Sequence, residues 1–152
     1  MSEGSAPTIH GSYLLPHFEH ATVGDAMHPG VLSCDAEATL TDIARMMSTH
    51  HVHCIVVDHA ARGEGDVSSA WGIISDLDLL RECLRPDVPD TVSDFALQAA
   101  IRVETTMALR DAAKLMLSNG VSHVVAANPE TQQPVGVVST LDIAGVLAWG
   151  EM

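Results

Sequence analysis

Residues 72–78 read Gly-Ile-Ile-Ser-Asp-Leu-Asp, and residues 136–142 read Gly-Val-Val-Ser-Thr-Leu-Asp. The shared pattern is a glycine, two β-branched apolar residues, a serine, and an aspartate three residues after the serine. An earlier segment repeats as well, because Thr-Val-Gly-Asp at residues 22–25 corresponds to Thr-Val-Ser-Asp at residues 91–94. An internal repeat of this kind predicts two copies of one structural unit, packed on each other about a pseudo-two-fold axis.

Between these end points, both copies show the same order of hydrophobic patterns. In the first copy we expect an extended segment at Val31–Cys34, a helix from Thr39, strands at His51–Val57 and Trp71–Ile74, and a helix from Ser75. In the second copy we expect strands at Ile101–Val103, Val121–Ala126 and Val135–Val138, a helix from about Leu109 to Asn119, and another over Leu141–Ala148. Each copy is therefore predicted as β-α-β-β-α. The chain is predicted as an α+β protein with two small sheets that carry helices on one face.

The repeat also predicts the domain organisation. We expect a partly mobile N-terminal extension at residues 1–20, one repeat at residues 21–85, a linker at residues 86–90, and a second repeat at residues 91–149. Each copy alone is short and has few aromatic residues, so we expect the two copies to pack as one module.

The composition indicates a globular protein and argues against several classes of partner. Hydrophobic residues make up 47% of the 152 residues, and 20 acidic residues against 7 basic ones give a formal net charge of −13. With so few cations, neither nucleic acid nor a membrane surface is expected as a partner. No apolar stretch has membrane-spanning length, and the N-terminus lacks a secretory pattern. The three cysteines have no C-x-x-C spacing and favour reduced thiols, so we expect a cytoplasmic protein.

The duplicated β-α-β-β-α unit that ends in Gly-x-x-Ser-x-x-Asp resembles the cystathionine-β-synthase (CBS) domain pair, or Bateman module, over about residues 21–148. Two motifs in register with two Thr-Val-x-Asp starts make the resemblance specific. It implies a regulatory module, with no catalysis and no obligatory cofactor. Such a module binds adenosine ligands (AMP, ADP, ATP or S-adenosylmethionine) in two clefts between the repeats. The resemblance further implies a homodimer that signals by conformational change to a separate effector protein.

By this resemblance, Ser75 and Asp78 hold ribose and phosphate in one cleft, and Ser139 and Asp142 do so in the other. A carboxylate can accept both hydrogen bonds of a ribose diol, and backbone N–H groups at a helix N-terminus favour phosphate. The same Ser-x-x-Asp pattern is also a helix capping box. The four residues could therefore serve only as caps, and the two roles are compatible.

In this family a basic residue that contacts phosphate often follows the valine that opens the central strand. His53 occupies this position after Val52, whereas the second copy has Ser122 there and His123 one residue later. This departure from strongly basic members argues against tight ATP binding. The apolar residues expected to wall an adenine are Val31, Leu32, Ile55, Ile101 and Val124.

Three alternatives stay open. The histidines could bind a metal, because His51 and His53 would share one face of a strand beside His50. No cysteine or acidic residue lies at a fixed motif spacing from them, so we expect no metal site. The chain could instead be a ligand-free homodimeric scaffold. A catalytic use of His53 with Asp78 is the third alternative, but no catalytic motif accompanies it, so we do not expect an enzyme.

Overall fold

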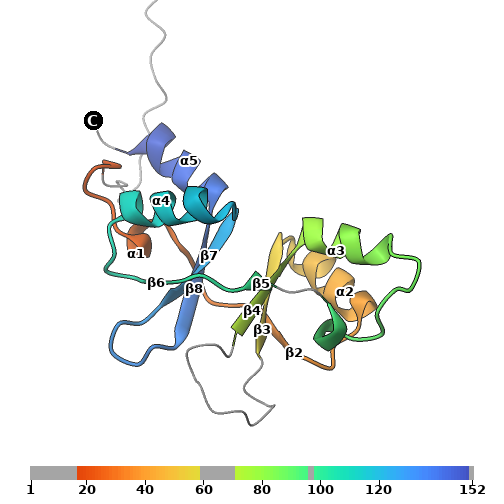
Figure 1. Ribbon diagram of the computed structural model, residues 1–152. Helices are drawn as coiled ribbons and strands as arrows, with labels where there is room; N and C mark the ends of the chain where they lie inside the picture. The colour runs from red at the N-terminus through yellow and green to blue at the C-terminus, as the bar shows by residue number, and fades with distance from the viewer. Residues whose placement is uncertain (1–16, 59–70, 96–97, 151–152) are drawn as a thin grey trace, which may run out of the picture.

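The computed structural model describes residues 17–58, 71–95 and 98–150. Figure 1 shows two halves side by side, each with a four-stranded sheet and helices packed on it. This is the predicted α+β architecture with two small sheets. Most of the expected N-terminal extension, and most of the loop expected between the two central strands of the first repeat, lie outside the described residues.

One half is built around the body of the first repeat. Its elements are β2 (Ser33–Asp35), α2 (Leu40–His50), β3 (Cys54–Asp58), β4 (Trp71–Ser75), α3 (Asp76–Cys83), the 3-10 helix η3 (Val92–Asp94) and β5 (Gln98–Ala99). The sheet order is β2-β3-β4-β5, with β2 parallel to β3 and the other pairs antiparallel.

The other half is built around the body of the second repeat. Its elements are α1 (Val23–Ala26), β1 (His28–Pro29), β6 (Arg102–Glu104), α4 (Leu109–Asn119), β7 (His123–Ala127), β8 (Pro134–Ser139) and α5 (Thr140–Trp149). The sheet order is β1-β8-β7-β6, again with one parallel pair, β6 and β7.

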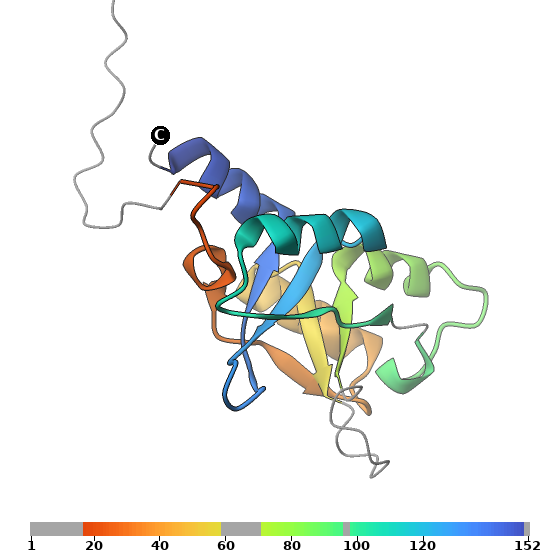
Figure 2. The same cartoon turned by 60° about the vertical axis from the view of Figure 1, so that its left-hand side comes forward.

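The opening segment of each repeat packs in the half formed by the other repeat. The N–H of Val23 donates to the carbonyl of Met107 (2.9 Å), and the N–H of Val92 donates to the carbonyl of Ala38 (2.8 Å). Strand β1 pairs with β8, and β5 pairs with β4. Figures 1 and 2 both show α1 against α4, although the two helices are far apart in the sequence. This exchange ties the two repeats into one module.

Each half has its own hydrophobic core, and an exchanged valine is part of each. Val23 is fully buried with Leu109 and Val138, while Val92 is fully buried with Ile43 and Ile74. Burial of a valine or leucine side chain contributes about 1.5–3 kcal/mol. The exchanged segments are therefore held by apolar packing as well as by backbone hydrogen bonds.

The strands before the clefts begin later than predicted. His51 ends α2 in the left-handed conformation (φ 52°), and β3 begins only at Cys54. The second repeat behaves in the same way, since Gly120 ends α4 at φ 62° and β7 begins at His123. A left-handed residue closes the last helical turn, so the chain must turn before it can extend.

A steric constraint explains why the second motif has glycine at position 136. Gly136 lies opposite Pro29 where β1 crosses β8, and a Cβ atom at Gly136 would come within 2.5 Å of the carbonyl oxygen of His28. Only glycine allows this close approach of the exchanged strand.

Candidate functional site

Two clefts lie between the repeats, and we name them after the helices that begin at them. The α3 cleft has a volume of about 150 Å³ and is lined by Ile73, Ser75, Leu77, Asp78, Arg81, Gly120, Val121, Ser122 and His123. The α5 cleft has a volume of about 280 Å³ and is lined by His28, Gly30, Leu32, His51, Val52, His53, Cys54, His123, Val137, Ser139, Leu141 and Asp142. Both clefts take residues from both repeats.

The two Ser-x-x-Asp motifs form nearly identical capping boxes. Asp78 Oδ2 accepts hydrogen bonds from the N–H (2.9 Å) and hydroxyl (2.9 Å) of Ser75. Asp142 Oδ2 accepts from the N–H (2.7 Å) and hydroxyl (2.9 Å) of Ser139. In both boxes the serine oxygen accepts from the aspartate N–H at 3.2 Å. The caps fix one carboxylate oxygen of each aspartate at the mouth of its cleft.

A capping box by itself does not mark a ligand site in this chain. Thr22 with Asp25 and Thr39 with Asp42 form the same box at α1 and α2, and none of these residues lines either cleft. Asp78 and Asp142 differ from Asp25 and Asp42 because they line a cleft, where the serine cap does not use their second carboxylate oxygen, Oδ1.

The Oδ1 atoms contact different nitrogen groups in the two clefts. Asp78 Oδ1 accepts from Arg81, one turn along α3, at 3.0 Å. Asp142 Oδ1 lies 2.7 Å from Nδ1 of His28, which arrives on the exchanged strand β1. Only 9% of the Asp142 side chain is exposed, against 36% for Asp78, so the α5 carboxylate is the more enclosed of the two.

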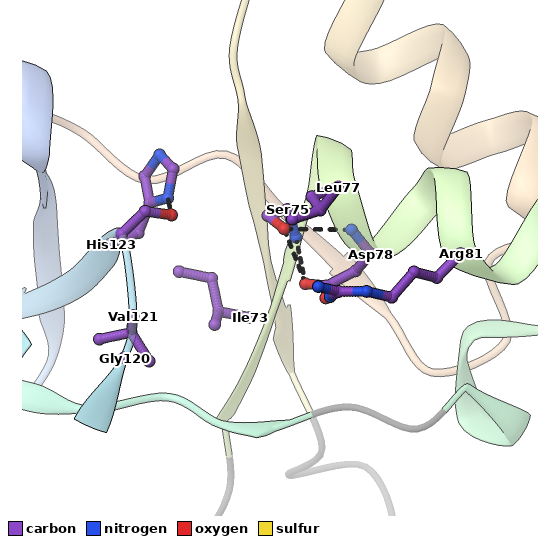
Figure 3. Close-up of a pocket in the computed structure, with 9 residues that line it drawn as sticks. Ile73, Ser75, Leu77, Asp78, Arg81, Gly120, Val121 and His123 are labelled. Atoms are coloured by element: carbon purple, nitrogen blue, oxygen red, sulfur yellow. Dashed lines mark hydrogen bonds and ion pairs between the residues drawn. The ribbon is translucent and has the colours of Figure 1, made fainter.

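The far wall of the α3 cleft comes from the second repeat. Figure 3 shows Gly120, Val121 and His123 on one side, with Ser75, Asp78 and Arg81 on the other and Ile73 between them. The hydroxyl of Ser122 lies 2.8 Å from Nδ1 of His123. Burial lowers the pKa of His123 below its ordinary value near 6.5, so its neutral form is favoured at pH 7.

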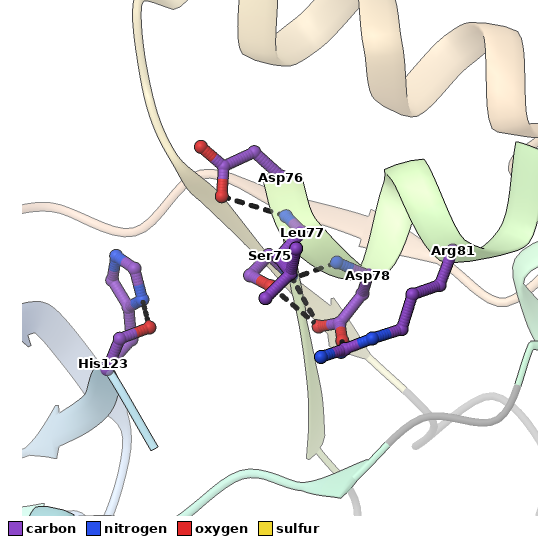
Figure 4. Close-up of polar contacts among 7 residues, drawn as sticks. Ser75, Asp76, Leu77, Asp78, Arg81 and His123 are labelled. Atoms are coloured by element: carbon purple, nitrogen blue, oxygen red, sulfur yellow. Dashed lines mark hydrogen bonds and ion pairs between the residues drawn. The ribbon is translucent and has the colours of Figure 1, made fainter. Parts of the chain in front are cut away.

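A hydrogen bond between Asp76 and His53 connects the first turn of α3 with the lining of the α5 cleft. Asp76 Oδ2 accepts a hydrogen bond from His53 Nδ1 at 2.8 Å, and this bond lowers the pKa of Asp76. Asp76 Oδ1 accepts from the N–H of Leu77 at 2.8 Å. His53 lines the α5 cleft and His123 lines both clefts. Figure 4 shows Asp76 at the first turn of α3, on the opposite side of Asp78 from Arg81.

The structure brings together all seven polar residues that the sequence indicates. The α3 cleft lining includes Ser75, Asp78, Ser122 and His123, and the α5 cleft lining includes Ser139, Asp142, His53 and again His123. The pairing crosses the repeats, because each motif faces the segment before the central strand of the other repeat.

The expected adenine wall needs correction. Of its five residues, Leu32 lines the α5 cleft, but Ile55 and Val124 have no exposed surface and belong to the two cores. Val31 and Ile101 are half-buried and are not part of either lining. Both side chains pack under the helices of their own half, Ile55 with Ile43 of α2 and Val124 with Leu109 of α4.

The apolar walls come instead from neighbouring positions. Ile73 and Val121 face the α3 cleft, and Val137 and Val52 are their counterparts in the α5 cleft. The period-two alternation before each serine places Ile73 and Val137 on the face opposite the fully buried Ile74 and Val138, a signal that sequence reasoning missed. His28 was also missed, because its contact depends on the exchanged strand.

The metal hypothesis loses its geometric basis in the part of the chain that the structure describes. His51 lies in a left-handed turn and His53 precedes β3, so the two do not share a strand face. Within residues 17–58, 71–95 and 98–150, no three His, Cys, Asp or Glu side chains are grouped closely enough to hold a metal ion. Over the same residues, no helix combines the length and apolarity needed to cross a membrane.

Comparisons with known proteins agree on the fold. The family model of the CBS domain matches residues 23–85 and 92–148. No curated protein matches the chain. Among solved structures, the CBS domain of a bacterial CNNM/CorC family Mg²⁺ transporter in complex with ATP is 19% identical, with a TM-score of 0.68 over 88% of this chain and 92% of that one.

Two further neighbours differ in what they hold. The CBS domain pair of protein MJ0100, in complex with 5′-methylthioadenosine and S-adenosyl-L-methionine, is 15% identical, with a TM-score of 0.70 over 84% of this chain and 96% of that one. Hypoxic Response Protein I, with two coordinated zinc ions, is 24% identical, with a TM-score of 0.60 over 82% of this chain and 98% of that one. At these identities, the likeness shows the fold alone.

Proposed function

The chain belongs to the CBS domain family, and we propose that it is a regulatory module that binds adenosine-type ligands in its α3 and α5 clefts. CBS domain pairs of this fold have been solved with ATP and with 5′-methylthioadenosine and S-adenosyl-L-methionine. The module would act on a separate effector protein through conformational change rather than through catalysis.

One observation carries the proposal. In each cleft, a capped serine and aspartate from one repeat face a short polar segment from the other repeat, before β7 in one case and before β3 in the other. A carboxylate oxygen that can accept from a ribose diol and an apolar wall that can contact a base therefore lie in the same cavity. Ligand pockets typically combine such apolar walls with a few polar groups.

The position of the clefts supplies a means of signalling. A ligand that contacts both walls of a cleft favours one relative placement of the two repeats over others. Because the exchanged segments link each repeat to the other half, such a shift would spread across the module. A ligand can drive this change only as far as its affinity differs between the two arrangements.

Thermal stability in the presence of ligands tests the proposal. The purified protein would be melted with AMP, ADP, ATP, S-adenosylmethionine, 5′-methylthioadenosine, NAD or Zn²⁺. A ligand at 100 times its dissociation constant stabilises the native state by about 2.7 kcal/mol, a readily measured shift. We expect at least one adenosine compound to raise the melting temperature.

A matched pair of double variants separates ligand binding from capping. Asp78→Ala/Asp142→Ala removes both cleft carboxylates, whereas Asp25→Ala/Asp42→Ala removes the same kind of cap at helices outside the clefts. Both variants lose stability, but only the first should lose the ligand-induced shift. If no adenosine compound stabilises the native chain, the binding function is wrong and the scaffold alternative takes its place.

A homodimer forms part of the proposal, and the exposed face of α3 favours it. Leu77, Leu80 and Leu84 are spaced along one face of the helix and are 53%, 56% and 81% exposed, whereas Glu82 on the same helix is buried. On α5, Leu141, Leu147 and Trp149 are also exposed. An apolar face turned outward in this way is typical of a protein interface.

Sedimentation velocity of Leu80→Glu/Leu84→Glu tests this interface. Neither residue lines a cleft, so the variant should be monomeric while it still responds to ligand. A wild-type chain that sediments as a monomer would remove the dimer from the proposal. We place the module in the cytoplasm, where its free cysteines Cys34, Cys54 and Cys83 would stay reduced.

A further inference from the structure

The two clefts treat the 5′ end of a bound adenosine differently. We infer that the α3 cleft selects an adenosine compound whose 5′ substituent is uncharged or cationic, and that Asp76 is the residue that excludes a 5′-phosphate from it. The inference rests on the proposed function, because it assumes that Asp78 holds the ribose. With the base against Ile73 and Val121, we place the 5′ end beside the first turn of α3. Asp76 does not line the cleft itself, but it lies in that turn between the lining residues Ser75 and Leu77.

That first turn has no backbone donor left for a phosphate. The first four N–H groups of a helix are the ones that bind anions. In α3 the N–H of Ser75 donates to Asp78, that of Asp76 to the carbonyl of His53, and that of Asp78 to Ser75. The remaining group, the N–H of Leu77, donates to the carboxylate of Asp76 at 2.8 Å.

The corresponding turn of α5 differs at one position. The N–H groups of Ser139, Thr140 and Asp142 have the equivalent partners, Asp142, the carbonyl of Ser122, and Ser139. Thr140 replaces Asp76, and in the described structure the N–H of Leu141 has no hydrogen-bond partner. The side chain of Asp76 therefore both blocks a donor and places a negative charge where α5 has neither.

Among the described residues, the ion-pair partner of Asp76 is His53 rather than an arginine or a lysine. The described basic residues are Arg45, Arg81, Arg85, Arg102, Arg110 and Lys114, and of these only Arg81 lines a cleft. Arg81 is paired with Asp78, the proposed ribose acceptor. Arg45, Arg85, Arg110 and Lys114 form ion pairs with acidic residues that line neither cleft, and Arg102 lies 4.7 Å from the centre of the Trp71 ring.

Neither of the two histidines near Asp76 adds a positive charge to the lining of the α3 cleft. His123 faces the α3 cleft, and its burial favours the neutral imidazole at pH 7. His53 donates to Asp76 and lines the α5 cleft rather than the α3 cleft. A phosphate beside Asp76 would meet a like charge at short range. The Asp76 side chain is 56% exposed, so solvent screens part of this repulsion, and the loss of the Leu77 N–H as a donor adds to it.

Reciprocal variants test the inference. Asp76→Thr gives α3 the residue of α5, and Thr140→Asp gives α5 the residue of α3. Calorimetric titrations would use adenosine, 5′-methylthioadenosine, S-adenosylmethionine, AMP and ATP in the background of Asp142→Asn, which weakens binding in the α5 cleft. In this background we expect 5′-methylthioadenosine to bind about tenfold or more tightly than AMP, and ATP to bind more weakly still.

Asp76→Thr should remove most of the discrimination, raising AMP affinity about tenfold while changing 5′-methylthioadenosine affinity less than about threefold. Thr140→Asp, measured in an Asp78→Asn background, should lower AMP affinity in the α5 cleft. Asp87→Thr is the control, because it makes the same change of net charge at a residue that is 88% exposed and outside both clefts. It should leave the preference intact.

The outcomes separate the inference from the function on which it rests. If AMP or ATP binds the α3 cleft as tightly as 5′-methylthioadenosine, or if Asp76→Thr leaves the preference unchanged, the inference is overturned while ligand binding stands. If no compound in the series binds either background or the unmodified protein, the proposed function itself fails.

Discussion

The α3 and α5 clefts share their frame and differ in their charges. Both aspartates are held by the same capping hydrogen bonds, to within 0.2 Å. Yet Asp78 pairs with an arginine of its own helix, while Asp142 pairs with a histidine from the exchanged strand. Position 76 is an aspartate where its counterpart, Thr140, is neutral. The two repeats therefore share the groups that we propose hold a ribose and differ at the position that we propose selects the 5′ group.

The largest expected effect comes from breaking the frame. Gly136→Ala places a Cβ atom within 2.5 Å of the His28 carbonyl oxygen, so the exchanged strand must move. We expect a loss of about 1–3 kcal/mol in the free energy of unfolding, measured by urea denaturation. Gly145→Ala is the matched control, because nothing lies within 4 Å of its Cβ and the residue is inside α5. It should be neutral or slightly stabilising, and equal losses in the two variants would contradict the packing described here.

The next effect concerns the two proposed ribose acceptors. Asp78→Asn and Asp142→Asn each remove one charge and one acceptor while keeping an oxygen that can cap the helix. We expect each single variant to lose one of two binding events, with affinity falling about tenfold or more at the altered cleft. Calorimetric stoichiometry with 5′-methylthioadenosine measures this. Identical titration curves for the wild type and both variants would show that the carboxylates do not hold the ligand.

The C-terminal ends of α2 and α4 also differ between the repeats, and variants there should change stability by a smaller amount. Both α2 and α4 end in a left-handed residue, but α2 uses His51 and α4 uses Gly120. A side chain in this conformation costs roughly 1–2 kcal/mol. We therefore expect His51→Gly to stabilise the protein by up to about 1 kcal/mol and Gly120→Ala to destabilise it by about 1 kcal/mol. Thermal melts of the two variants measure these changes. Melting temperatures that shift in the same direction in both variants would contradict the left-handed conformation assigned to both residues.

The smallest effect is a pH dependence between pH 7 and pH 5 that we assign to His123 of the second repeat. Burial lowers the pKa of His123, whose counterpart in the first repeat is Cys54. Below about pH 6.5 the unfolded chain takes up a proton at this residue more readily than the folded one, so stability should fall as the pH drops toward the folded pKa. His123→Gln should flatten the melting temperature between pH 7 and pH 5. An unchanged slope would assign the effect to other groups near the clefts.

Local patterns predicted the fold well where short-range chemistry determines it. Helices follow Thr39 and Ser75, α4 runs from Leu109 to Asn119, and the two Ser-x-x-Asp motifs form the capping boxes that the pattern indicated. These features depend on residues three or four positions apart, which a sequence displays directly.

Long-range packing explains what the sequence did not reveal. The exchange of the opening segments brings His28 to Asp142, a contact that no local pattern indicates. Ile55 and Val124 were expected at the clefts because they are apolar residues in strands close to the motifs. They are enclosed because they face the helices of their own half, where Ile55 shares a core with Ile43 of α2 and Val124 shares one with Leu109 of α4.

The central claim is that an adenosine compound binds between the repeats, and backbone amide chemical shifts test it most directly. The ¹⁵N-labelled protein would be titrated with 5′-methylthioadenosine and followed by two-dimensional NMR. We predict that shifts concentrate at the cleft segments around Ser75–Asp78 and Gly120–His123, with the α5 cleft responding as well. A spectrum that does not change, or shifts confined to surfaces outside both clefts, would contradict the account.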